Sequence, residues 1–326
     1  MINIFTTITS TIFIYYHQKK FQMYMERLAV VDDTLKELGT PKMYRKLHIL
    51  SKGMIIGWIV HTVITNIYSS IWWIKSVKQV SWGILLPYII NHCYHINEFT
   101  DIILIFLLWY VATRFDIIND HMHCLLLKEY HGLVWKKPVI IPGYFLHRHN
   151  YKRTYWISTH LHLELCRIAR ELNMTFGMQI TFNTLSHLAF LTSFCYYLCS
   201  ILEQKHQVKK LLLPLSGLGY RCFTCLIRLC AVNHICESVE NKSNYIDKII
   251  HQLTNTLRYA DIWKEIDFFL LHVTQHPLKF TGLGLFYLGY KFLQKFLTTT
   301  LTLVIIMVQL NMQSVIDILI TLKVRI

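Results

Sequence analysis

The stretch from Phe296 to Ile320, FLTTTLTLVIIMVQLNMQSVIDILI, restricts the fold of this chain more than any other. As one helix it is long enough to cross the ~30 Å hydrocarbon core of a bilayer. It also carries threonine and glutamine side chains, which would not be expected on a helix that faces only lipid. The end of the chain is therefore predicted to be a membrane span with one face that is not turned to lipid.

The polar residues of this span fall on one side of the predicted helix. At about 100° per residue, Thr298, Thr302, Gln309 and Gln313 lie within roughly 60° of one another, and Ile305 interrupts them on the same face. Such a stripe suits a helix that lines a water-filled path with a dry constriction, because a hydrophobic ring can close a channel by dewetting. The alternative is that threonine and glutamine form hydrogen bonds between packed helices, as in many membrane bundles.

Composition supports a helical membrane protein: 53% of the residues are hydrophobic and 16% are charged. A net charge of +14 would otherwise suggest nucleic acid as a partner, but the Lys and Arg residues are dispersed and no nucleic-acid-binding motif accompanies them. The nine Cys residues and the His-x-His pairs lack the further ligands of a metal site. We therefore expect no nucleic-acid partner, no metal and no cofactor. The sequence shows no nucleophile–base arrangement, so an enzyme is not predicted.

Apolar stretches organise residues 1–326 as a single polytopic domain. The first stretch, 2–16, would extend only about 22 Å as a helix, short of a bilayer, so it looks like a truncated span. Five full spans are predicted at 54–74, 84–112, 174–201, 211–234 and 296–320.

Positive charge predicts the orientation of these spans. Of the 33 Lys and Arg residues, 24 lie in the segments 17–53, 113–173 and 235–295, which are therefore assigned to the cytoplasm, with the C-terminus outside. Ile246, Ile249 and Ile250 recur at the spacing of an amphipathic helix. The spans are thus expected to continue beyond the bilayer and to pack as a cytoplasmic helical bundle. The predicted fold class is all-α, a polytopic helical membrane protein with cytoplasmic helical extensions.

A family resemblance begins in the last span. Thr302-Leu303, five apolar residues and Gln309-Leu310 resemble the C-terminal signature of insect gustatory receptors, which is Thr-Tyr, five hydrophobic residues and Gln-Phe. Leucine replaces both aromatic residues here. The preceding segment, FTGLGLFYLGYKFLQKF from Phe280 to Phe296, resembles the one that precedes the signature in that family, with Gly284 and Phe286 in the corresponding places.

Further matches follow in the order that the family has them. Val31-Asp32 with Leu35 and Leu38-Gly39 resembles its V-D-x-x-L-x-x-L-G run, and Arg114-Phe115 with Asn119 resembles its R-F-x-x-h-N run. Asn173, Phe176 and Gly177 open the next span as family members do. Because the matches run in order from about residue 24 to residue 310, the resemblance covers nearly the whole chain. It implies that the first family span is missing and that the second begins at Met1.

The resemblance implies a function. Insect gustatory receptors are seven-span, ligand-gated cation channels of the plasma membrane with an external C-terminus. Their four subunits surround a pore lined by the last span, and each subunit holds a ligand pocket in its outer half. By this resemblance the chain is an insect chemoreceptor-like bundle that binds a small-molecule tastant, assembles as a homo- or hetero-tetramer in membrane lipid, and has its gate near Ile305, Val308 and Gln309.

Orientation indicates which side chains lie near the outer ends of the spans, where the pocket is expected. Aromatic walls with a few polar groups are typical of small-molecule sites. The candidates are Trp72, Trp73, Tyr88, His92, Tyr197 and Tyr220. The alternative is an interfacial belt, because Trp and Tyr gather at the surfaces of any membrane protein.

Charged residues inside two spans predict an ion pair. Charge within a membrane is costly and tends to be paired or to line a wet cavity. Counted at 1.5 Å per residue from the outer ends, Asp101 and Arg228 both lie at roughly 25 Å depth, so they are expected to meet.

Two other classes of function compete with a gustatory channel. A transporter would show inverted repeats with Gly or Pro interrupting corresponding spans, whereas Pro87 and Pro214 lie only near the openings of two spans. The other alternative is an odorant-receptor-type chemoreceptor. The sequence does not identify the ligand.

Overall fold

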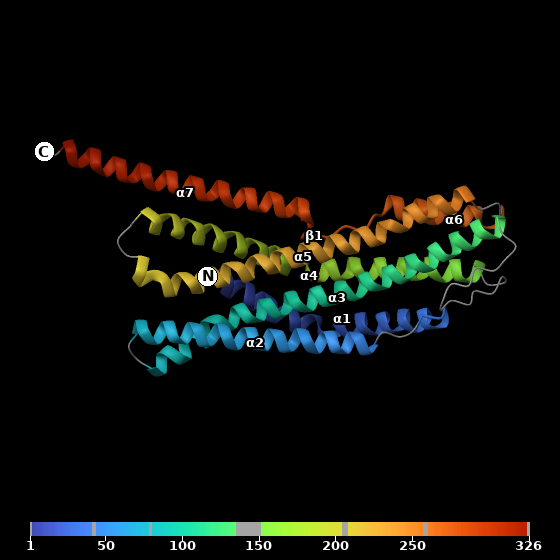
Figure 1. Ribbon diagram of the computed structural model, residues 1–326, viewed down its shortest axis with the longest axis horizontal. Helices are drawn as coiled ribbons and strands as arrows, with labels where there is room; N and C mark the ends of the chain where they lie inside the picture. The colour runs from blue at the N-terminus through green and yellow to red at the C-terminus, as the bar shows by residue number, and fades with distance from the viewer. Residues whose placement is uncertain are drawn as a thin grey trace.

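The computed structural model describes residues 2–40, 44–77, 80–134, 151–203, 208–256 and 260–324. These residues form helices and one short antiparallel hairpin (Figure 1). In chain order the elements are α1 (Ile2–Glu37), α2 (Tyr44–Val77), α3 (Val80–Val134), α4 (Tyr151–Glu203), α5 (Val208–Thr256), α6 (Ala260–Gln275), β1 (Thr281–Gly282), β2 (Phe286–Tyr287) and α7 (Tyr290–Val324).

Three of the helices are far longer than a bilayer is thick. α3, α4 and α5 have 55, 53 and 49 residues, which at 1.5 Å per residue is roughly 75–80 Å. They run along the long direction of the molecule (Figure 1). Each helix that contains one of these predicted spans therefore continues well beyond it without a break, and the chain is a helical membrane protein.

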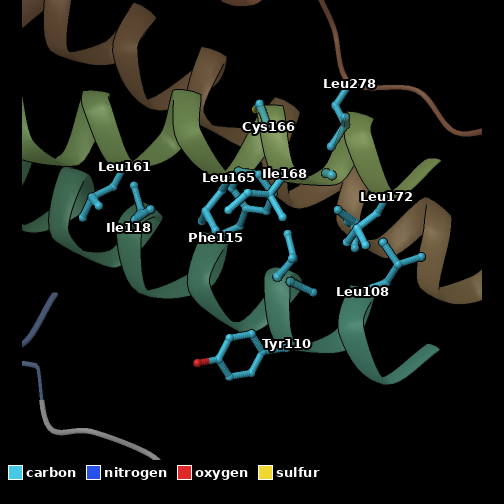
Figure 2. Close-up of a cluster of buried hydrophobic side chains, with 14 of the residues drawn as sticks. Leu108, Tyr110, Phe115, Ile118, Leu161, Leu165, Cys166, Ile168, Leu172 and Leu278 are labelled. Carbon is cyan, nitrogen blue, oxygen red and sulfur yellow. The ribbon is translucent and has the colours of Figure 1, made fainter. Parts of the chain in front are cut away.

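The main hydrophobic core lies in one half of the molecule, where α1 and α6 pack against α3, α4 and α5. Phe115 of α3 and Leu165 and Leu172 of α4 are fully buried there. Figure 2 shows this cluster, with Leu278 of the segment after α6 beside it. Because fully burying one such side chain contributes about 1.5–3 kcal/mol, this half is the part of the chain that can fold around its own apolar interior.

The other half, which contains α2 and the far end of α7, exposes apolar side chains. On α2, Ile55, Ile59, Val63 and Ile67 are all about half exposed. Large exposed apolar surfaces mark contact with a membrane or a partner, and on a helix of this length lipid is the expected neighbour. Among the described residues, four helical segments are long and apolar enough to cross a membrane, namely Leu47–Ile74, Lys152–Ile201, Leu215–Gln252 and Tyr290–Leu310.

These four segments overlap the predicted spans 54–74, 174–201, 211–234 and 296–320. The predicted spans 2–16 and 84–112 lie in α1 and α3, which are not among the four. The exact span boundaries stay predictions.

Several residues that carry the family resemblance have a direct structural role. Gly39, with φ at +92°, ends α1: its N–H donates to the Lys36 carbonyl (2.9 Å), and the Thr40 N–H donates to the Leu35 carbonyl (3.1 Å). Glycine adopts this backbone conformation without strain, which explains its place two residues after Glu37, the last residue of α1.

Two separate motifs meet in the core. Arg114 of α3 donates from Nε to Asp32 of α1 (2.6 Å) and from Nη2 to the same carboxylate (2.9 Å), and both side chains are buried. The Tyr110 hydroxyl also donates to Asp32. The V-D motif and the R-F motif therefore each contribute one partner of a buried ion pair that joins α1 to α3.

Candidate functional site

The short hairpin positions the start of the last helix. β1 and β2 pair with Thr281 opposite Tyr287 and Gly282 opposite Phe286. The turn between them places Leu283 and Gly284 at positive φ, and Gly289, with φ at +126°, directly precedes α7. This hairpin was not expected from the sequence; it lies between α6 and α7, in the segment before the last span.

Three acceptors on one face of α5 hold the hairpin by its backbone. The side-chain oxygen of Asn233 accepts the N–H of Gly289 (2.8 Å), Glu237 accepts that of Tyr290 (2.6 Å), and Glu240 accepts that of Phe280 (2.6 Å). Residues at i, i+4 and i+7 of a helix share a face, so this row is a single anchoring surface. The first backbone donor of α7 is thereby tied to α5.

A fourth anchor comes from α4. The Asn173 side chain accepts the Thr281 N–H (3.0 Å) and donates to the Thr281 hydroxyl (3.3 Å). A Cβ added at Gly177 would lie 3.4 Å from the Leu283 nitrogen, so the small residue allows the hairpin to approach α4 closely. Asn173 and Gly177, which belong to one of the motifs that resemble the family, thus contact the hairpin, which belongs to another.

α7 packs against the rest of the chain through one narrow face. Phe296, Thr300 and Val304 are buried, and Phe296 contacts the cluster formed by Leu191 of α4 and Leu229 of α5. These α7 residues recur every four positions, which is the spacing of one helical face. Beyond this contact the helix diverges from its neighbours and ends apart from them (Figure 1).

The predicted polar stripe lies on the opposite face. Thr298, Thr302, Ile305 and Gln309 are all exposed, and Ile305 is 57% exposed. At 100° per residue the stripe lies about 180° from the buried face of α7. The side chain of Gln313 falls outside the described residues. Among the described residues, the side chains of Thr298, Thr302 and Gln309 form no hydrogen bond with another helix, so the choice between pore lining and helix packing concerns contacts outside the described part of one chain.

The threonines of the stripe have a defined hydrogen-bond polarity. The Thr298 hydroxyl donates to the Gln294 carbonyl and the Thr302 hydroxyl donates to the Thr298 carbonyl, each at 2.9 Å. A hydroxyl has only one hydrogen to donate, so each Oγ1 presents lone pairs to its surroundings. Oxygen acceptors of this kind are suited to a cation rather than to an anion.

A buried polar cluster joins α3, α4 and α5 at the level of the predicted ion pair. Arg228 of α5 forms an ion pair with Asp101 of α3 and donates to it from Nε (3.0 Å). Asn183 of α4 donates to the other oxygen of Asp101 (2.8 Å), and Glu98 lies 3.7 Å from Arg228. Asp101 and Arg228, which were expected to meet because they lie at the same depth in the membrane, are thus in contact.

The cluster extends to α2 through two histidines. Glu98 lies 3.2 Å from His61 Nε2 and 3.3 Å from His95 Nδ1, and the other ring nitrogen of His61 lies 2.7 Å from the Tyr220 hydroxyl. Arg221 also donates to Asn91. The sequence predicted the pair of Asp101 and Arg228 but no partner for Glu98. The helical spacing of the α3 residues Asn91, His95 and Glu98 is the signal that could have identified this polar face.

A cavity of about 20 Å³ adjoins the ion pair. Its polar walls come from Asp101, Asn183, His187, Arg228 and Asn233, and Leu288 of the segment after β2 closes one side. Such a volume holds one water molecule and no larger ligand. Among the described residues no group of three or more His, Cys, Asp or Glu side chains is placed to hold a metal ion.

The residues predicted for the ligand pocket lie on four helices, α2 to α5, and none of them lines the cavity beside the ion pair. Trp72 and Trp73 of α2 contact each other edge to face, at 5.3 Å between ring centroids. Tyr88, His92 and Tyr197 are exposed on α3 and α4. Tyr220 is the member of the set that contacts the polar cluster, through His61. Their role in ligand binding stays a prediction.

A family model described as 7tm chemosensory receptor matches residues 1–314. The insect olfactory receptor OR5 from Machilis hrabei has a similar structure, with a TM-score of 0.69 and 11% identity over 95% of this chain and 79% of that one. Its complex with eugenol gives a TM-score of 0.53 and 14% identity over 95% and 81% of the two chains. A comparison with curated protein sequences gives no match.

Proposed function

Because this chain belongs to the 7tm chemosensory receptor family, we propose that it is a gustatory receptor subunit that opens a cation channel when a small-molecule tastant binds. The Thr302-Leu303 and Gln309-Leu310 signature supports a gustatory rather than an odorant-type receptor. The absence of a nucleophile–base arrangement in the sequence agrees with a receptor that is not an enzyme.

The exposed polar face of α7 is the observation that carries this proposal. α7 packs on its own chain through Phe296, Thr300 and Val304, and within the described part of one subunit this leaves Thr298, Thr302 and Gln309 exposed. Polar side chains facing lipid would be unfavourable, so the face requires water or another subunit. Four copies of α7 around a common axis supply both, because their stripes enclose a hydrated path.

Ile305 is the proposed gate of that path. It lies between Thr302 and Gln309 on the same face, and four copies would form an apolar ring between two polar ones. The outward-facing Oγ1 atoms of Thr298 and Thr302 and the amides of Gln309 and Gln313 would then replace part of the hydration shell of a passing cation.

The ligand is proposed to bind in the outer half of each subunit, and the C-terminus to lie outside the plasma membrane. The pocket candidates Trp72, Trp73, Tyr88, His92, Tyr197 and Tyr220 lie toward that side in the orientation that positive charge predicts. An epitope tag after Ile326 should be reached by antibody on intact cells, and a tag near Pro138 should not. The reverse pattern would contradict the orientation.

Whole-cell current tests the channel directly. Ile305→Ser wets the narrowest ring and should give current without ligand, whereas Ile306→Ser, about 100° around the helix, should leave the resting channel closed. Gln309→Leu should lower the conductance of the Ile305→Ser channel, because leucine offers a cation no oxygen.

The accessibility of substituted cysteines along α7 tests independently which of its residues line the pore. Substituted cysteines should react most strongly at Thr302, Ile305 and Gln309, with helical periodicity. Strongest reaction at Leu303 and Val304 would remove α7 from the pore. A response confined to volatile odorants, with none to a tastant panel, would assign the chain to the odorant-receptor type.

A further inference from the structure

Two lysines extend the polar stripe of α7 toward the hairpin. Lys291 lies seven residues before Thr298, which lies seven before Ile305; Lys295 stands in the same relation to Thr302 and Gln309. Seven residues of an α-helix return to nearly the same angle, within about 20°. Both lysines are exposed, so they continue the face that carries the proposed pore residues.

Neither ammonium group forms an ion pair or a hydrogen bond with another described residue. The neighbouring acids of α5, Glu237 and Glu240, are instead turned toward the backbone, where they accept the N–H groups of Tyr290 and Phe280. Their carboxylates therefore hold the hairpin in place and leave the two lysine charges uncompensated on the exposed face. This arrangement puts isolated positive charge at the end of α7 that joins the helical bundle.

We infer that Lys291 and Lys295 form two rings of positive charge at the bundle-side mouth of the channel and set its preference for monovalent over divalent cations. This inference rests on the proposed function, because it needs four copies of α7 around one axis. The physical reason is that the repulsion of a cation by a fixed positive ring scales with the charge of the ion. A divalent cation is therefore depleted at the mouth by the square of the factor for a monovalent one.

Coulomb's law gives the size of the effect. Four unit charges about 10 Å from the axis in water, screened with a Debye length of about 8 Å, lower the local concentration of a monovalent cation about twofold and that of a divalent cation about fivefold. Neutralising one ring should thus raise the Na⁺ conductance about twofold and the Ca²⁺/Na⁺ permeability ratio about twofold. At 1 M salt, where the Debye length is about 3 Å, both differences should disappear.

The experiment uses the full chain carrying Ile305→Ser, so that the channel conducts without ligand. Lys291→Gln and Lys295→Gln are compared with Lys291→Arg, which keeps the charge, and with Lys264→Gln, which removes an exposed lysine from α6. Single-channel conductance and reversal potential are measured in excised patches. The salt concentration is then raised on the bundle side alone, because a merely structural effect of the substitution would not depend on it.

Lys291→Gln and Lys295→Gln should have a larger conductance and a higher Ca²⁺/Na⁺ permeability ratio than the Ile305→Ser parent. Lys291→Arg and Lys264→Gln should behave like that parent. At high salt the conductance and the permeability ratio of all variants should become equal. A conducting channel in which Lys291→Gln and Lys264→Gln behave alike would overturn the inference while leaving the proposed pore intact. No current from the Ile305→Ser parent would overturn the proposed pore and the charged mouth with it.

Discussion

Asp32→Asn tests how much of the stability of the bundle depends on the buried ion pair between α1 and α3. In the native structure the carboxylate accepts two hydrogen bonds from Arg114, at 2.6 and 2.9 Å, and one from the Tyr110 hydroxyl. Both charged side chains are only 4% exposed. The substitution changes hardly any volume, so its effect reports charge and hydrogen bonding rather than packing.

The expected loss is large because Arg114 cannot lose its proton. Asparagine offers one acceptor oxygen, and its amide would place two N–H donors against the donors of the guanidinium. Removing one partner of a buried ion pair leaves an uncompensated charge and costs about 3–5 kcal/mol. For a chain of this size that corresponds to a decrease in the unfolding temperature on the order of 10 °C.

Thermal unfolding of the detergent-solubilised receptor, followed by size-exclusion chromatography, measures the effect. Glu37→Gln is the matched control, because it removes an exposed carboxylate from the same helix. The double variant Asp32→Asn/Arg114→Gln leaves no buried charge and should be more stable than Asp32→Asn alone. If Asp32→Asn unfolds at the same temperature as the control, or if the double variant unfolds at a lower temperature than Asp32→Asn, the ion pair does not hold α1 to α3 as argued here.

Two further predictions concern other buried polar groups. Asp101→Asn should reduce surface expression because Arg228 loses its nearer carboxylate and keeps only that of Glu98, 3.7 Å away; the cost should be smaller than the roughly 3–5 kcal/mol of leaving a buried charge with no partner. Exchanging Asp101 and Arg228 should restore only part of the expression, because Glu98 then lies beside the new aspartate; an exchange no better than the worse single variant would contradict the pairing. Burial lowers the pKa of His121, whose Nε2 lies 2.9 Å from the Thr40 hydroxyl. Below about pH 6.5 the unfolded chain therefore takes up a proton at His121 that the folded chain refuses, so this residue should lower the stability as the pH falls, by up to about 1.4 kcal/mol per pH unit. In His121→Gln, thermal unfolding measured between about pH 7 and about pH 5 should depend less steeply on pH by that contribution.

The stripe on α7 could be predicted because helical periodicity is local. The positions of Thr298, Thr302, Ile305 and Gln309 around a helix follow from their sequence numbers alone, and the structure adds which face is buried. The long helices were predictable for the same reason. The approach of Asp101 to Arg228 was also accessible, because the bilayer fixes a common depth scale for residues that are distant in sequence.

Partners that depend on tertiary packing were not accessible from the sequence. Asp32 and Arg114 were each singled out by resemblance to separate motifs, but nothing local indicates that α1 and α3 bring them together. The hairpin from Thr281 to Tyr287 was missed because two-residue strands carry no periodicity. It depends on glycines at positive φ and on acceptors from α5, such as Asn233, which lies 56 residues before Gly289 in the sequence.

The position of α5 suggests how the polar cluster and the last helix are connected. Arg228 binds Asp101, and Asn233, five residues later on the same helix, holds the N–H of Gly289 at the start of α7. Five residues of a helix span about 7.5 Å, and one small cavity is lined by Asp101, Arg228, Asn233 and Leu288 together. Because α5 is continuous through both contacts, no loop lies between Arg228 and Asn233, so a displacement of Arg228 along the helix would move Asn233 as well. The hairpin, with its positive-φ residues and its backbone anchors, is then the element whose rearrangement would let α7 move relative to the bundle.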